Sequence, residues 1–82
     1  MAVDYVVVGA GSAGCVLAAR LSEDGANVVL LEAGPKDRNP MIHIPAGVRS
    51  LLYHPVVNWN YSSEPSEGSG GRRIHWPRGK VL

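Results

Sequence analysis

The sequence predicts an α/β fold, in which a Rossmann-like strand–helix–strand unit is followed by an extended segment rich in Pro and Gly. Two apolar runs at residues 5–8 and 28–31 flank a stretch with helical spacing, and a G-x-G-x-x-G match occupies residues 9–14. All six prolines follow this unit. We therefore expect a βαβ core at residues 1–34, and at 35–82 an extended segment with loops of the same, larger domain.

Each element of the expected unit has its own local signal. Residues 5–8, Tyr-Val-Val-Val, form a run that is stopped by Gly9, as in a strand buried on both faces of a parallel sheet. Residues 12 to about 24 show helical spacing, with small residues on the face toward the sheet. Gly25 ends this helix, and the Val-Val-Leu-Leu run at 28–31 forms the second strand. The short joins predict a right-handed crossover.

Composition excludes several classes of protein. The 82 residues are 45% hydrophobic and 18% charged, which is not the composition of a disordered chain. No apolar stretch approaches the roughly 18–20 residues of a transmembrane helix, and no secretory signal is seen, so we expect a cytoplasmic protein. A chain of this size buries only about 60% of its unfolded surface, which suggests a fragment.

Cysteine and histidine offer no metal site. The single cysteine, Cys15, excludes an internal disulfide framework and a multi-cysteine zinc site. The histidines at 43, 54 and 75 match no compact metal motif, and we expect them to be surface or packing residues. Cys15 lies in the first turn of the expected helix, where a thiol can be activated. We expect it instead to be a small buried hydrophobe.

Charge is divided unequally along the chain. Residues 1–34 carry one basic and four acidic residues, and residues 35–82 carry seven basic and three acidic residues. Part of this excess is a basic cluster beside Trp76, made of Arg72, Arg73, Arg78 and Lys80. It has the features of a small nucleic-acid patch, but it contains no arginine-rich run. We favour a solvated loop with one or two phosphate contacts, and no nucleic-acid partner.

The glycine motif at residues 9–14 indicates a function only through its neighbouring elements, since glycines alone are common in turns. It follows a buried strand and opens a helix, which is the arrangement of a dinucleotide-binding turn. Gly9 permits the tight turn, a side chain at position 11 would occupy the space of a pyrophosphate, and Gly14 lets the helix approach the strand. The helix N-terminus then offers N–H groups to the phosphates.

An acid at the end of the second strand completes this interpretation. Glu32 lies 23 residues after Gly9 and is placed to accept both hydroxyls of an adenosine ribose. Its charge would repel a 2′-phosphate, so NADP is disfavoured. The alternative is a solvated glutamate at a strand end. NAD and FAD share this feature, so the residues alone predict an adenine dinucleotide.

The motifs together resemble the N-terminal part of the glucose–methanol–choline (GMC) oxidoreductases, especially their choline-dehydrogenase-like branch. The resemblance covers the whole chain. It is carried by residues 4–23 (DYVVVGAGSAGCVLAARLSE), 31–35 (LEAGP), 58–61 (NWNY), 64–65 (EP) and 77–82 (PRGKVL). The resemblance implies FAD as the cofactor and oxidation of a small-molecule alcohol to a carbonyl, by hydride transfer to the flavin.

The resemblance also implies roles for individual residues. It places Gly9, Gly11, Ser12, Ala13 and Gly14 at the pyrophosphate, Glu32 at the ribose, Trp59 near the adenine, and Arg78 and Val81 near the flavin end, and it includes Ala33 among the cofactor-binding residues. Trp59 has the alternative role of filling a core. No catalytic residue carries over, because none of the histidines lies in the catalytic motif of the family. The remainder of the same polypeptide is then the expected partner.

Two other functions stay open at this point. A lyase of the same superfamily keeps FAD without using it for redox turnover. A free-standing nucleotide-binding module would have to be stable with 82 residues.

Overall fold

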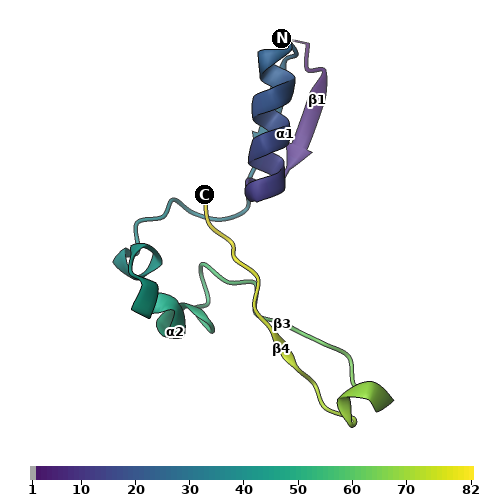
Figure 1. The fold of residues 1–82 in the computed structure, drawn as a ribbon, viewed down its shortest axis with the longest axis vertical. Coiled ribbons are helices and arrows are strands. Elements are labelled where there is room, and N and C mark those ends of the chain that lie inside the picture. The colour runs from purple at the N-terminus through teal and green to yellow at the C-terminus, as the bar shows by residue number, and fades with distance from the viewer. Residues whose placement is uncertain (1) are drawn as a thin grey trace. The chain divides into compact units, whose positions relative to one another are not determined.

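A computed structural model describes residues 2–82, which form two compact units. Residues up to Ala33, with Leu82, belong to the first unit, and Gly34–Val81 make up the second (Figure 1).

The first unit is the expected βαβ unit. It consists of β1 (Tyr5–Val8), α1 (Ser12–Glu23) and β2 (Val28–Leu31). The two strands pair in parallel, with Tyr5 opposite Val28 and Val8 opposite Leu31. The N–H of Gly9 extends this ladder by donating to the carbonyl of Leu31 at 2.7 Å. The predicted Rossmann-like beginning is thus confirmed.

Helix α1 ends in a Schellman motif. The N–H of Gly25 donates to the carbonyl of Ser22 at 3.0 Å, and the N–H of Ala26 donates to that of Leu21 at 3.1 Å. Gly25 adopts φ +91°, which a side chain disfavours. The glycine that marked the helix end in the sequence is therefore required by its backbone conformation.

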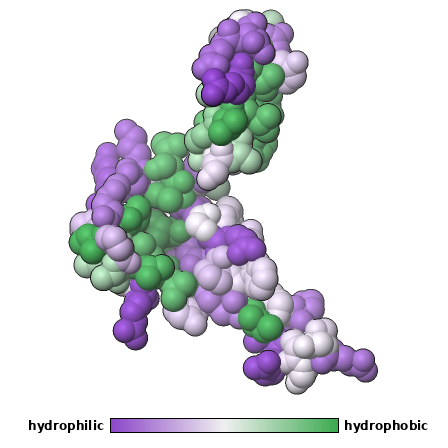
Figure 2. Space-filling view, in the orientation of Figure 1, coloured by the Kyte–Doolittle hydropathy of each residue, from purple (hydrophilic) through white to green (hydrophobic). Residues whose placement is uncertain are grey.

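The strands are more exposed than their sequence predicts. Val6 and Val8 on β1 remain 58% and 82% exposed, and Leu31 on β2 remains half exposed. Within residues 2–82 this sheet has only two strands, and α1 packs against it. Hydrophobic surface is accordingly visible on this unit (Figure 2). A parallel sheet normally has both faces covered, which the described residues do not achieve.

The second unit begins with short helical turns, which lie in the segment that the sequence predicts as extended chain with loops. These are η1 (Pro40–His43), η2 (Pro45–Gly47) and α2 (Val48–Leu51). Proline occupies the first position of both η1 and η2, where its missing N–H costs nothing. Asn39 caps η1 by accepting the N–H of Met41 at 3.0 Å. Residues 40–51 are therefore folded into turns rather than extended.

An antiparallel hairpin follows. Its strands β3 (Tyr61–Ser62) and β4 (His75–Trp76) pair directly, and an isolated bridge joins Asn58 to Gly79 in the same register. This part of the second unit is extended, as predicted.

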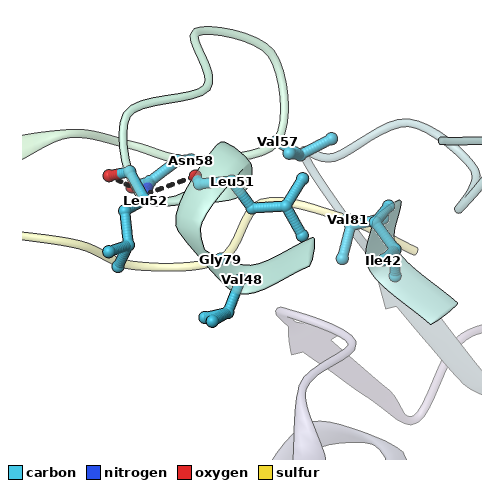
Figure 3. A pocket seen from close by; sticks show the side chains of 8 residues that line it. All are labelled: Ile42, Val48, Leu51, Leu52, Val57, Asn58, Gly79 and Val81. Atoms are coloured by element: carbon cyan, nitrogen blue, oxygen red, sulfur yellow. Dashed lines mark hydrogen bonds between the residues drawn. The ribbon is translucent and has the colours of Figure 1, made fainter. Parts of the chain in front are cut away.

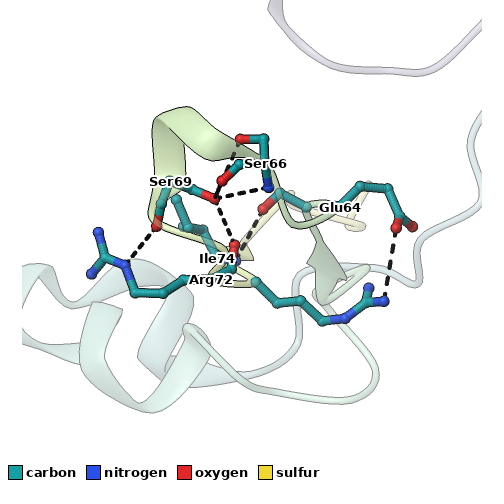
Figure 4. A network of polar contacts seen from close by, with 7 residues as sticks. Glu64, Ser66, Ser69, Arg72 and Ile74 are labelled. Atoms are coloured by element: carbon teal, nitrogen blue, oxygen red, sulfur yellow. Dashed lines mark hydrogen bonds and ion pairs between the residues drawn. The ribbon is translucent and has the colours of Figure 1, made fainter.

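The tip of the hairpin is an organised turn, η3 (Glu67–Ser69), and not merely an exposed loop (Figure 4). The N–H of Ser66 donates to the hydroxyl of Ser69 at 3.2 Å, and Nε of Arg72 donates to the carbonyl of Ser69 at 2.8 Å. Gly70 follows with φ +64°.

Within residues 2–82, no helix has the length and apolar character needed to cross a membrane.

Candidate functional site

The candidate site is the turn between β1 and α1, which contains three glycines, and the chain itself requires a glycine at two of these positions. Gly9 adopts φ +101°, which favours glycine. A Cβ on Gly14 would overlap the carbonyl oxygen of Gly9 and lie 3.5 Å from Cγ1 of Val7. Gly11 has φ −76° and ψ −170°, which any residue adopts, and a Cβ there would meet no atom of the described chain within 4 Å. Nothing in the described chain demands a glycine at position 11.

The N-terminus of α1 opens beside Gly11 without a protein cap. Gly11 is the N-cap residue, it has no side chain to bond with the helix, and no acidic residue lies in the first turn. Among the described residues, the N–H groups of Ser12, Ala13 and Gly14 have no hydrogen-bond partner. Unsatisfied N–H groups and the helix dipole together favour an anion at this position.

Glu32 is held against the same turn. The N–H of Ala10 donates to Oε2 of Glu32 at 2.8 Å, across 22 residues of sequence. The carboxylate follows β2 directly and is half-buried, and Ala33 beside it is exposed. The structure therefore brings together the glycine turn, the helix N-terminus and the acid that the sequence singled out.

These residues fit the pyrophosphate and ribose of a dinucleotide. The open space over Gly11 admits a phosphate where a side chain would stand, and the N–H groups of Ser12, Ala13 and Gly14 are suitable donors to it. Glu32 supplies a carboxylate acceptor of the kind that binds ribose hydroxyls.

The other predicted site residues, Trp59, Arg78 and Val81, belong to the second unit. Trp59 is 43% exposed and stacks on Tyr61 with ring centroids 5.8 Å apart, so it fills no core among the described residues. The guanidinium of Arg78 lies 4.9 Å from the ring centroid of Trp76. The roles of these three residues toward a cofactor stay predictions.

Val81 lines an apolar pocket of about 220 Å³ in the second unit (Figure 3). Its lining is Ile42, Val48, Leu51, Leu52, Val57, Asn58, Gly79 and Val81. Asn58 contributes the polar side chain of this set, and its amide group is engaged by backbone groups. The pocket thus offers hydrophobic surface and little hydrogen-bonding capacity.

The histidines have structural partners. Nδ1 of His54 accepts the N–H groups of Val56 and Val57 at 3.2 and 3.4 Å, which closes a turn. Nε2 of His75 lies 2.8 Å from the carbonyl of Leu52. Nε2 of His43 lies 3.2 Å from Oδ2 of Asp37. The expectation of surface or packing roles agrees with these contacts.

Cys15 departs from its expectation. It is exposed rather than buried, and Sγ donates to the carbonyl of Ala10 at 3.2 Å. The reason is that Cys15 follows Gly14 in α1, and Gly14 is the residue that approaches β1.

The sequence did not indicate the structural roles of Gly34 and Asn58. A Cβ on Gly34 would overlap the peptide that joins Lys80 to Val81, nearly fifty residues further on in the sequence. Asn58 is 6% exposed, a rare position for a polar side chain. Its place between apolar Val57 and Trp59 was a signal, but the partners of the amide were not visible in the sequence.

Comparisons with known proteins assign the chain to a family. The family model described as lycopene cyclase protein matches residues 4–44, which include the βαβ unit. An uncharacterised GMC-type oxidoreductase of Mycobacterium bovis is 56% identical over 80 residues, covering 96% of this chain and 15% of that protein. The mitochondrial choline dehydrogenase of Homo sapiens is 53% identical over 85 residues, covering 94% of this chain and 14% of that protein. The chain belongs to the GMC oxidoreductase family.

The two assignments differ, and we prefer the GMC assignment because those matches extend through the second unit, whereas the lycopene cyclase match ends at residue 44.

A solved GMC relative agrees with the fold. The crystal structure of pyridoxine 4-oxidase from "Mesorbium loti" superposes with a TM-score of 0.86 at 44% identity, covering 98% of this chain and 16% of that one. The chain spans about 15% of the length of the GMC relatives that it matches.

Proposed function

We propose that this GMC chain binds the adenosine and pyrophosphate part of FAD, in an oxidoreductase that oxidises an alcohol CH–OH group to a carbonyl. The observation that carries the proposal is the glycine at position 11. Its backbone conformation suits any residue and no described atom lies near its missing side chain. A ligand that needs the vacant space explains the glycine, and a pyrophosphate is such a ligand.

The first turn of α1 binds the phosphates in this proposal. The N–H groups of Ser12 and Ala13 donate to phosphate oxygens, and the helix dipole adds roughly half a positive charge at this end. No acidic side chain in the first turn opposes the phosphate charge. The positive φ of Gly9 lets the chain turn directly from β1 into this position.

Glu32 binds the adenosine ribose in this proposal. Its Oε2 is anchored by the N–H of Ala10, which orients the carboxylate toward the turn. Carboxylate acceptors suit the two hydroxyls of a ribose, and the same charge opposes a 2′-phosphate. The site therefore favours FAD over cofactors that carry a 2′-phosphate, and members of the GMC family are FAD flavoproteins.

FAD supplies the hydride acceptor when it is bound, and the chain's own residues supply its binding and orientation. Choline and pyridoxine, after which two relatives are named, both carry hydroxyl groups, which supports an alcohol as the substrate class. Arg78 and Val81 lie near the flavin end in this proposal. Because the relatives are several times longer, the catalytic base and the substrate pocket come from segments that correspond to their remaining length.

The test uses the purified protein that carries this chain. We expect a yellow protein that releases FAD on denaturation and loses its visible absorbance when an alcohol is added without oxygen. Gly11→Val should abolish the bound flavin. The matched control is Gly68→Val, because a Cβ at Gly68 meets no atom closer than Oγ of Ser66 at 4.0 Å.

Two results would redirect the proposal. Bound FAD that no alcohol reduces would favour the non-redox lyase. Full flavin content in Gly11→Val would show that the turn does not hold the pyrophosphate.

A further inference from the structure

Asn58 is the most buried polar side chain of the described residues, at 6% exposure, and its amide joins two elements of the second unit. Nδ2 donates to the carbonyls of Leu51 and Leu52 at 3.2 and 2.9 Å, at the end of α2 (Figure 3). Oδ1 accepts the N–H of Asn60 at 2.8 Å. It also accepts the N–H of Arg78 at 3.1 Å. One side chain thus links α2 to the segment that begins at Arg78, just after β4.

The segment from Arg78 to Val81, which follows β4, is confined on both sides. The carbonyl of Val57 accepts the N–H of Lys80 at 2.8 Å, and the carbonyl of Arg78 accepts the N–H of Trp59 at 2.9 Å. On the other side, Gly34 lies so close to the Lys80–Val81 peptide that it has no room for a Cβ. A segment held this way has a defined backbone position, and Asn58 relates that position to α2.

A buried amide is a costly way to fill space, because each of its polar atoms needs a partner. An apolar residue of the same size would suit the hydrophobic lining of the pocket around Asn58. It would leave the N–H of Arg78 and two helix-end carbonyls without their present partner. The advantage of asparagine here is therefore the direction of its hydrogen bonds, which sets where the segment from Arg78 lies.

We propose that Asn58 is a positioning residue, which holds the Arg78–Val81 segment in the place from which it meets the flavin. The inference rests on the proposed function for the location of that segment. Asn58 touches no reacting atom in this account and acts through the backbone of Arg78. Displacement of such a segment by about 1 Å can lower a rate by about a hundredfold.

The first measurement needs no cofactor. In Asn58→Leu, hydrogen exchange of the peptide that covers residues 77–82 should be about tenfold faster, because the acceptor for the Arg78 N–H is lost. The matched control is Asn60→Gly. Asn60 has φ +51°, which glycine tolerates, and its Nδ2 reaches only carbonyls of residues 53–58 and none in the Arg78–Val81 segment. Exchange of residues 77–82 should be unchanged in this control.

The second measurement uses the flavin-loaded protein. Asn58→Leu should retain FAD, shift the visible absorption and circular dichroism of the flavin, and slow its reduction by alcohol at least tenfold. Asn60→Gly should leave these flavin signals as in the parent. An Asn58→Leu protein with parental exchange, spectrum and reduction rate would overturn the inference. A parent protein without any flavin would overturn the proposed function instead, and the exchange result would still report on the link between Asn58 and Arg78.

Asn58→Asp tests the positioning role if Asn58→Leu does not fold. The carboxylate still accepts from Arg78 but cannot donate to Leu51 and Leu52. We expect faster exchange at the end of α2, protected residues 77–82 and a parental flavin spectrum. A flavin spectrum that changes without any change in the exchange of residues 77–82 would overturn the positioning role.

Discussion

Adding one methyl group at Gly14 should destabilise the βαβ unit, whereas a larger side chain at Gly11 should weaken only FAD binding. In Gly14→Ala the new Cβ overlaps the carbonyl oxygen of Gly9 and lies 2.9 Å from its carbonyl carbon. Overpacking costs up to about 3 kcal/mol, and an overlap with backbone belongs at that upper end. Alanine returns about 1 kcal/mol through its better helix propensity, so the expected net loss is about 2 kcal/mol.

Gly11→Ser is the matched variant in the same turn. Its Cβ meets no described atom within 4 Å, and serine caps a helix better than glycine by a few tenths of a kcal/mol. The stability of the apoprotein should therefore be unchanged or slightly higher. FAD affinity should fall more than about tenfold, because the side chain stands where the proposal places a phosphate.

Urea unfolding of both apoproteins and titration with FAD, followed by flavin fluorescence, measure the two effects separately. The reasoning predicts a lower midpoint for Gly14→Ala with an unchanged slope, and the parental midpoint for Gly11→Ser. A stable Gly14→Ala protein would show that α1 can move away from β1 at little cost. Parental FAD affinity in Gly11→Ser would refute the phosphate site.

Substitutions at three further residues test other contacts. Glu32→Ala loses charge-assisted hydrogen bonds of about 1.5–3 kcal/mol each, so FAD affinity should fall at least about tenfold in a fluorescence titration. Affinity for flavin mononucleotide, which lacks the adenosine, should not change, and equal losses for both ligands would contradict the ribose role. Gly34→Ala should lower the free energy of unfolding by about 1–3 kcal/mol, because its Cβ overlaps the Lys80–Val81 peptide. An unchanged urea midpoint would contradict that close approach. His54→Leu removes the acceptor for the N–H groups of Val56 and Val57, so the free energy of unfolding should fall by about 1 kcal/mol or more in the same assay. His54→Asn keeps an acceptor and should lose less stability. Equal losses in the two variants would contradict the role of His54 in this turn.

Local sequence signals predicted the first unit closely. The bounds of β1 and β2 agree with the apolar runs at residues 5–8 and 28–31, and α1 ends one residue before the predicted position. These elements depend on neighbours within a few residues, through periodicity and the conformational freedom of glycine at turns. The glycine turn was predictable for the same reason.

The second unit was less predictable because its contacts join residues far apart in the chain. The turns at residues 40–51 depend on proline positions that also suit extended chain, and the hairpin register pairs Asn58 with Gly79. Neither leaves a periodic pattern in the sequence. The same holds for the exposure of Cys15, which depends on the side of α1 that approaches β1.

The sequence by itself determined the order of the elements in the first unit and the residues of the nucleotide turn, since both follow from local backbone preferences. Only the tertiary structure showed that Gly11 is free of any packing demand, while Gly14 is not. It also placed the carboxylate of Glu32 on the N–H of Ala10 and the amide of Asn58 on the N–H of Arg78. The partners in these two pairs are twenty or more residues apart in the sequence. How the elements pack decides such pairs, because the residues around a side chain in the sequence do not indicate which distant group it will contact.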